Sequence, residues 1–213
     1  MKDTKTTNEV KNNKVKVLST RGITVISLLS AISIILMLFE IPLWFVPIFY
    51  KIDFSEVPVL IGAFTLGPIA GIMIELIKIL LNLMINGTET AFIGEIANFI
   101  IGCMLVVPSA IIYHRKRTKK AAVQGLMVGT VVFIIAGGLL NAYLLLPTYA
   151  KLSGMPIDRL IAMGTAVNPN ITSLSTFILF AVTPFNIIKG VLVSIITFLL
   201  YKNVSTVIKE FHK

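Results

Sequence analysis

Three ionisable side chains lie inside strongly apolar stretches of this 213-residue sequence, namely Glu75, Lys78 and Lys189. An ionisable group inside a bilayer costs about 2.5–3.5 kcal/mol on insertion scales, so such residues indicate a binding site or a solute pathway. Glu75, Lys78 and Asn82 are spaced by three and four residues and therefore share one face of a helix. Asn186 and Lys189 are three residues apart and share a face in the same way.

Further polar groups are expected at a similar depth. Glu95 and Asn98 stand three residues apart at the start of another apolar stretch, and Asn141 stands near the end of a third. Side chains from four helices could then converge on one cavity open to the outside, which is typical of a site for a polar, partly aromatic solute. Two simpler alternatives are a Glu75–Lys78 ion pair within one helix, and asparagines that only join helices by hydrogen bonds.

The composition places these residues in a membrane protein. Hydrophobic residues make up 56% and charged residues 14% of the chain, and the mean hydropathy is +0.91. Soluble domains are roughly 45–50% apolar and 25% charged. The net charge is +9, but the basic residues cluster between apolar stretches. The positive-inside rule explains that clustering, so no nucleic-acid partner is expected.

The basic clusters also predict the topology. They precede the first apolar stretch, follow residue 114 and close the chain, so an even number of spans should separate each pair. Parity then requires a break in the stretch 57–85, and Gly67-Pro68 supplies it because proline removes a helical hydrogen bond. We expect an all-α integral membrane protein with six transmembrane helices and cytoplasmic N and C termini. The predicted spans are 23–39, 57–67, 68–85, about 95–113, 123–146 and 177–201.

The expected domain organisation is a membrane domain, 23–202, between cytoplasmic tails at 1–22 and 203–213. Two extracellular loops are predicted, at 41–56 and at 147–176, and the second should hold a short interfacial helix. The 41–56 loop could be a lid or only an interfacial belt, because it is rich in the aromatic residues Trp44, Phe45, Phe49, Tyr50 and Phe54.

Motifs of catalysis are missing from the sequence. It has no G-x-x-x-x-G-K-[ST] loop, no H-E-x-x-H and no G-x-S-x-G. The two histidines, His114 and His212, lie at or beyond predicted helix ends. We therefore expect no catalytic residues, no metal site and no intrinsic cofactor. If ATP drives transport here, another chain must hydrolyse it.

Residues 53–58 (DFSEVP), followed by Gly67-Pro68, Gly71 and Lys78, resemble the substrate-binding S components of energy-coupling factor (ECF) vitamin transporters. Residues 94–99 (GEIANF) and 184–190 (PFNIIKG) are similar to the riboflavin-specific subgroup. The resemblance covers about residues 20–202. It implies an S-component fold in the plasma membrane of a bacterium.

The resemblance also implies a function. Such a subunit captures riboflavin from outside and associates with a transmembrane coupling protein (T component) and two cytoplasmic ATPases. The 41–56 loop would cover the ligand, with Leu43, Phe45 and Phe54 as candidate contacts. Asn141, Asn186 and Lys189 would contact the flavin ring. The remaining candidate substrate-binding residues are Glu75, Lys78, Asn82, Glu95 and Asn98.

The first predicted helix would dock the T component. Family members often carry an A-x-x-x-A pattern there, and Ser27 and Ala31 are the small residues at this spacing. Two other functions stay open. The chain could be an S component for another vitamin or a flavin-related compound. It could instead be a stand-alone secondary transporter, although neither coupling-ion residues on a continuous path nor inverted repeats are evident.

Overall fold

The computed structural model describes residues 17, 19–47, 50–88, 92–152 and 154–210, so Phe49, most of the predicted N-terminal tail and residues 211–213 of the C-terminal tail lie outside it. Within these residues, five helices are long and apolar enough to cross a membrane. Three of them are single α-helices, α1 (Thr20–Leu38), α3 (Pro68–Asn86) and α4 (Ile93–Lys116). The fourth is the continuous helical segment Lys119–Leu152, which begins with α5 (Lys119–Leu140). The fifth is the segment Leu174–Tyr201, most of which belongs to α9 (Thr183–Glu210). A shorter apolar helix, α2 (Glu56–Leu66), completes the predicted six.

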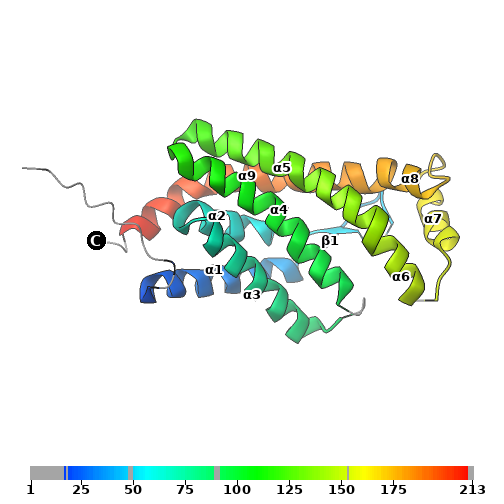
Figure 1. Ribbon diagram of the computed structural model, residues 1–213, viewed down its shortest axis with the longest axis horizontal. Coiled ribbons are helices and arrows are strands. Elements are labelled where there is room, and N and C mark those ends of the chain that lie inside the picture. The colour runs from blue at the N-terminus through cyan, green and yellow to red at the C-terminus, as the bar shows by residue number, and fades with distance from the viewer. Residues whose placement is uncertain (1–16, 18, 48–49, 89–91, 153, 211–213) are drawn as a thin grey trace, which may run out of the picture.

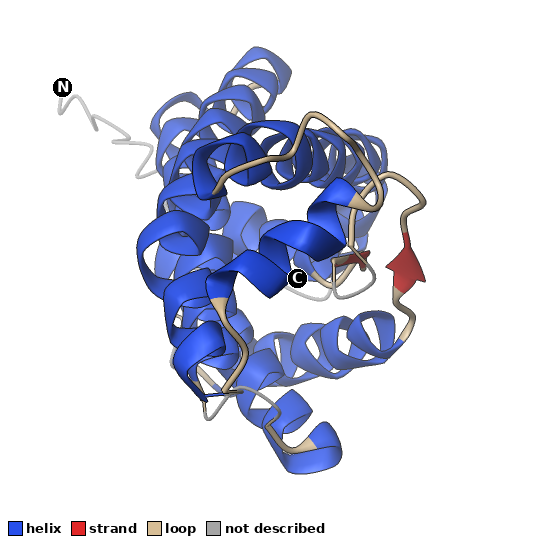
Figure 2. Ribbon diagram, turned by 90° about the vertical axis from the view of Figure 1, so that its right-hand side faces the viewer, coloured by secondary structure: helices blue, strands red, loops and turns tan. Residues whose placement is uncertain are grey.

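The helices form one elongated bundle (Figure 1). The start of α1, the turn between α4 and α5, and the end of α9 lie at the same end, which we call the basic end. This agrees with the prediction that an even number of spans separates the basic clusters, which places them on one side of the membrane. The opposite end, which we call the loop end, carries the strands β1 (Ile41–Pro42) and β2 (Lys51–Ile52), which pair antiparallel. Figure 2 looks onto the loop end.

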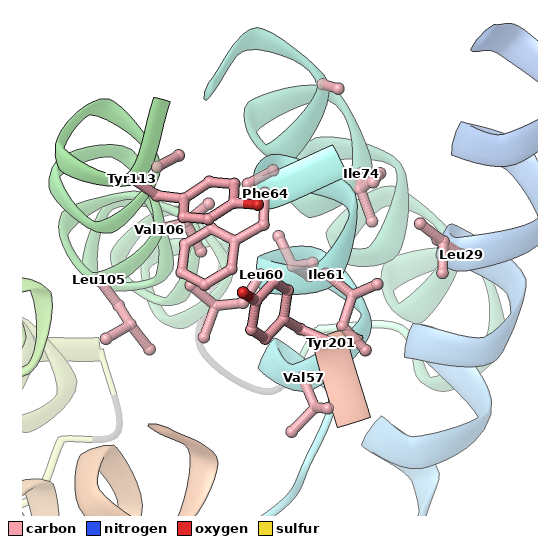
Figure 3. Packing of buried hydrophobic residues seen from close by; sticks show 14 of the residues in the cluster. Leu29, Val57, Leu60, Ile61, Phe64, Ile74, Leu105, Val106, Tyr113 and Tyr201 are labelled. Carbon is pink, nitrogen blue, oxygen red and sulfur yellow. The ribbon is translucent and has the colours of Figure 1, made fainter. Parts of the chain in front are cut away.

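The predicted break between the second and third helices is confirmed. Gly67 has φ 116°, a left-handed conformation that suits glycine, and Pro68 is the first residue of α3. The 11 residues of α2 extend only about 17 Å, roughly half of a bilayer core. Nearly all of them are buried, so α2 is an interior helix around which the others pack (Figure 3). Phe64 stacks on Tyr113 of α4 at 4.6 Å between ring centroids.

Two of the predicted helix ends are wrong. The fifth span does not stop at residue 146 but continues through α6 (Leu146–Leu152), and the sixth begins at α8 (Leu174–Phe177) rather than at 177. In both cases a π-helical turn, η1 (Asn141–Leu145) or η2 (Ile178–Val182), precedes a proline. In a regular α-helix the ring of a proline collides with the carbonyl four residues before it. For Pro147 and Pro184 these are the carbonyls of residues 143 and 180, and both lie in the wider π-helical turns. The 147–176 loop is correspondingly shorter, and the helix predicted within it is α7 (Ile157–Thr165).

Candidate functional site

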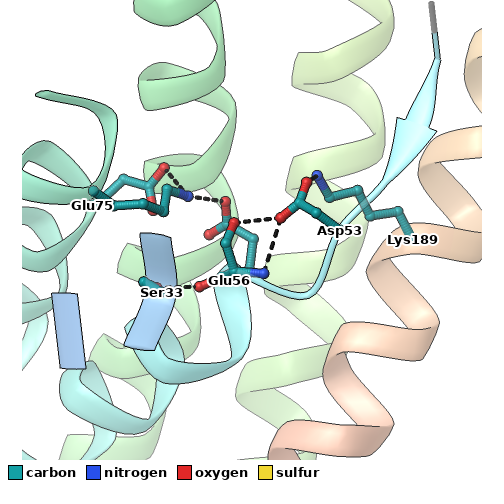
Figure 4. Close-up of polar contacts among 7 residues, drawn as sticks. Ser33, Asp53, Glu56, Glu75 and Lys189 are labelled. Atoms are coloured by element: carbon teal, nitrogen blue, oxygen red, sulfur yellow. Dashed lines mark hydrogen bonds and ion pairs between the residues drawn. The ribbon is translucent and has the colours of Figure 1, made fainter. Parts of the chain in front are cut away.

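A fully buried lysine joins two helices near the middle of the bundle. Lys78 Nζ lies 2.8 Å from Glu56 Oε1 at the start of α2 and 2.8 Å from Glu75 Oε1 on α3. The exposed fraction is 0% for Lys78 and Glu75 and 1% for Glu56. The predicted Glu75–Lys78 pair therefore exists, but it is part of a triad with Glu56 (Figure 4).

A second buried lysine, Lys189, is bound by Asp53, three residues before Glu56. Lys189 Nζ of α9 donates to Asp53 Oδ2 at 2.8 Å. Asp53 Oδ1 in turn accepts from the backbone N–H of Ser55 at 2.9 Å and from the Ser55 hydroxyl. The carbonyl of Ser55 accepts from the hydroxyl of Ser33 on α1. Burial alone would raise the pKa of Asp53, but the charges of Lys189 and Lys78 and these hydrogen bonds outweigh it, so the pKa lies below its usual value.

Residues 53–56 therefore connect three helices from inside the bundle. Asp53 contacts α9, Ser55 contacts α1, and Glu56 contacts α3. The sequence prediction used this segment only as a family motif and assigned it no partners. The charges of the apolar stretches could have indicated these partners. Lys78 and Lys189 carry two positive charges and Glu75 only one negative charge, and buried charges are normally paired. Asp53 and Glu56, directly before an apolar helix, were the nearest unused carboxylates.

Of the residues expected to contact the flavin ring, Asn141 is bound by a loop residue, Tyr50. The Tyr50 hydroxyl donates to Asn141 Oδ1 at 2.6 Å, and Asn141 Nδ2 donates to the carbonyl of Gly137 at 2.8 Å. The Tyr50 ring lies 5.2 Å from the Phe185 ring, and burial raises the pKa of the phenol. Asn186 is 5% exposed, and among the described residues its Nδ2 has no hydrogen-bond partner. The amide can therefore still donate a hydrogen bond to a further group.

A polar cavity of about 550 Å³ opens towards the loop end. It lies between α1, the β1–β2 hairpin, α3 and the start of α4. Three predicted residues line it, Asn82, Glu95 and Asn98, together with Glu40 and Lys51, which form an ion pair across its rim. Carboxylate, amide and ammonium groups of this kind suit hydroxyl-bearing solutes, because they offer both donors and acceptors.

The predicted site residues thus fall into three groups rather than on the walls of one cavity. Asn82, Glu95 and Asn98 line the cavity. Glu75 and Lys78 lie deeper on α3, in the buried triad. Asn141, Asn186 and Lys189 lie on the side of η1 and α9 and are not among the residues lining the cavity. Among the described residues, no cluster of His, Cys, Asp or Glu could hold a metal ion.

The remaining predicted residues lie in the 41–56 loop and on α1. Leu43, Phe45 and Phe54 are partly buried and pack on the apolar cluster at the loop end. Ser27 and Ala31 lie on the exposed face of α1, opposite the buried Ser33. One helix therefore presents small residues outward and holds the loop through its inner face.

Comparison with known proteins agrees with this architecture. The family model described as "ECF transporter, substrate-specific component" matches residues 21–201. The chain is 35% identical to a Staphylococcus aureus protein named riboflavin transporter RibU, over 87% of this chain and 90% of the relative. It is 34% identical to a Bacillus subtilis protein named riboflavin transporter FmnP, over 85% and 90%.

A solved structure gives the same result. It is described as the S component of a bacterial ECF transporter, and it superposes with a TM-score of 0.67 at 34% identity, covering 88% of this chain and 96% of that one. These relatives are transporter components and not enzymes. With its apolar helices and its fold, this chain belongs to the substrate-specific S components of ECF transporters and is a multi-pass protein of a bacterial plasma membrane.

Proposed function

We propose that this chain is the riboflavin-binding S component of an ECF transporter. It captures the vitamin at the loop end, which faces the outside because the basic end is cytoplasmic by the positive-inside rule. The observation that carries the proposal is the buried Nδ2 of Asn186, which has no hydrogen-bond partner in the described part of the chain and lies beside Lys189 and Asn141. The relatives of this chain are named riboflavin transporters.

The chemistry of riboflavin suits these groups. A carboxamide can donate and accept at once, so Asn141 and Asn186 match the adjacent donors and acceptors on the pyrimidine edge of the flavin ring. Lys189 would stabilise negative charge on the same edge. The ribityl hydroxyls would bind Glu95, Asn98 and Asn82 in the cavity. The 41–56 loop would act as a lid, with Leu43, Phe45 and Phe54 covering the ring.

The first test is an absorbance spectrum of the detergent-purified protein, followed by a titration of riboflavin fluorescence. Flavin bands near stoichiometry support the proposal. Asn186→Ala and Lys189→Ala are expected to weaken binding at least tenfold, because an unpaired buried partner costs about 1–3 kcal/mol. Asn170→Ala and Lys151→Ala, both at exposed positions of the loop end, are matched controls. Wild-type affinity in the Asn186 or Lys189 variant would refute this site.

Uptake would require partners. A T component would dock on the exposed small residues Ser27 and Ala31 of α1, and two ATPases would supply the energy. Co-expression with an ECF module should give ATP-dependent riboflavin uptake, and Ala31→Trp should abolish uptake without changing riboflavin affinity. Uptake by the chain alone would favour a secondary transporter. Binding of another vitamin, but not riboflavin, would keep the fold and replace the ligand.

A further inference from the structure

An apolar groove runs along the bundle surface between α5 and α9, towards the basic end and away from the site described above. Its volume is about 430 Å³. The two helices pack side by side there (Figure 1). Its walls are exposed aliphatic side chains that recur every four residues on each helix, namely Val123, Met127 and Val131 on α5 and Val191, Ile195 and Leu199 on α9.

The polar groups in the floor of the groove do not need a hydrogen bond from a bound molecule. Thr130 and Ser194, the two hydroxyl residues that line it, lie 2.9 Å apart and form a hydrogen bond with each other. In a bilayer such a groove faces hydrocarbon, so only a lipid chain or an apolar protein surface can fill it.

The dimensions favour a single chain. Along α5 the wall extends from Val123 to Val131, which is about 12 Å at 1.5 Å per residue. Helices packed side by side have axes only about 8–10 Å apart, so the furrow between one row of side chains on each is narrower than a third helix. A single extended acyl chain is narrower than a helix and fits this shape.

Positive charge stands at one end of the groove. Lys119 is four residues before Val123, so it lies on the same face of α5 as the groove wall, and Lys120 follows it. Both are exposed, as are Arg115 and Lys116 at the end of α4 and Arg117, which follows it. Basic residues beside a crevice between transmembrane helices on the cytoplasmic side are typical of sites for anionic lipid headgroups.

We propose that the groove between α5 and α9 binds one acyl chain of an anionic phospholipid, whose phosphate lies at Lys119 and Lys120. The chain would contact Met127 and the other wall residues, and the headgroup would lie at the basic end. The site is independent of the vitamin site, because no residue is shared between the two.

The test uses the full chain in phosphatidylcholine vesicles in which a tenth of the lipid has brominated acyl chains. Trp44 is the only tryptophan, so Trp44→Phe gives a background in which Met127→Trp places a single probe in the groove wall. Val128→Trp is the matched control, because Val128 is exposed at the same depth but does not line the groove. Brominated phosphatidylglycerol is compared with brominated phosphatidylcholine.

We expect the Met127→Trp probe to be quenched several-fold more efficiently by the anionic lipid, and the Val128→Trp probe to be quenched equally by both. Adding Lys119→Gln and Lys120→Gln should remove the preference, since each basic residue near an anionic surface contributes roughly a fivefold change in affinity. Val131→Trp, one turn further along the wall, is a second probe should the first variant fail to fold.

Three results would overturn the proposal. Equal quenching by both lipids in the groove would exclude a selective site. A preference that survives the two lysine substitutions would exclude the proposed headgroup position. Weak quenching by both lipids, in protein that elutes as a dimer, would show that a second copy covers the groove instead.

Discussion

Replacing Asp53 with asparagine should weaken the fold and the ligand site together, because it removes the charge that faces Lys189. The two side chains are only 10% and 11% exposed, and 2.8 Å separates their charged atoms. Breaking a fully buried pair by removing one partner costs about 3–5 kcal/mol. Asparagine keeps an oxygen that can accept from the N–H of Ser55, and the pair retains some contact with water. We therefore expect a loss of about 2–3 kcal/mol in the free energy of unfolding.

A double-mutant cycle separates the pair from other effects of the substitution. The free energy of unfolding is measured by denaturant titration in detergent for the wild type, Asp53→Asn, Lys189→Gln and the double variant. If the ion pair carries the effect, the double variant should recover at least about 1 kcal/mol relative to additivity. Additivity within about 0.5 kcal/mol would refute the reasoning, because it would mean that the two groups do not interact. Riboflavin titration of Asp53→Asn should show weaker binding, since Lys189 loses the carboxylate that positions it.

The pH dependence provides an independent check on the same residue. The pKa of Asp53 in the folded protein lies below its ordinary value of 3.8. Its ionised form therefore stabilises the fold at pH values above about 4, and this contribution is lost as the pH falls towards the folded-state pKa. Between pH 7 and pH 4 the contribution should stay constant, and below pH 4 the wild type should lose stability more steeply than Asp53→Asn. Parallel curves for the two proteins would contradict this assignment.

Two further predictions rest on matched pairs of residues. Lys78→Met should cost about 3–5 kcal/mol in unfolding free energy, because two buried carboxylates lose their cation. Lys51→Met breaks a pair that is 42% and 45% exposed and should cost less than about 1 kcal/mol; equal losses would contradict the burial argument. Gly137→Ala should weaken riboflavin binding, since its Cβ would collide with the Asn186 amide, whereas Gly138→Ala meets only Ile178 at 3.7 Å. Fluorescence titration should separate these two variants, and equal affinities would place Asn186 outside the site.

The amino-acid sequence by itself predicts much of the architecture. Apolar stretches and basic clusters predict which segments lie in the bilayer as helices and on which side their ends fall, because a segment in lipid must pair its own backbone polar groups. The break at Gly67-Pro68 follows from proline geometry alone. The ends at residues 146 and 177 could not be placed in the same way, because the π-helical turns before Pro147 and Pro184 let both helices continue.

The partners of the buried charges are the part that only the tertiary structure decides. Helical spacing places Glu75 beside Lys78, because that contact lies within one turn. Glu56 reaches Lys78 from 22 residues away, and Asp53 reaches Lys189 from 136 residues away. No local pattern determines contacts at such separations, since they depend on the 41–56 loop entering the bundle beside α1, α3 and α9. The sequence therefore determines that charges are buried in the membrane, and the packing of the loop determines which of them neutralise one another.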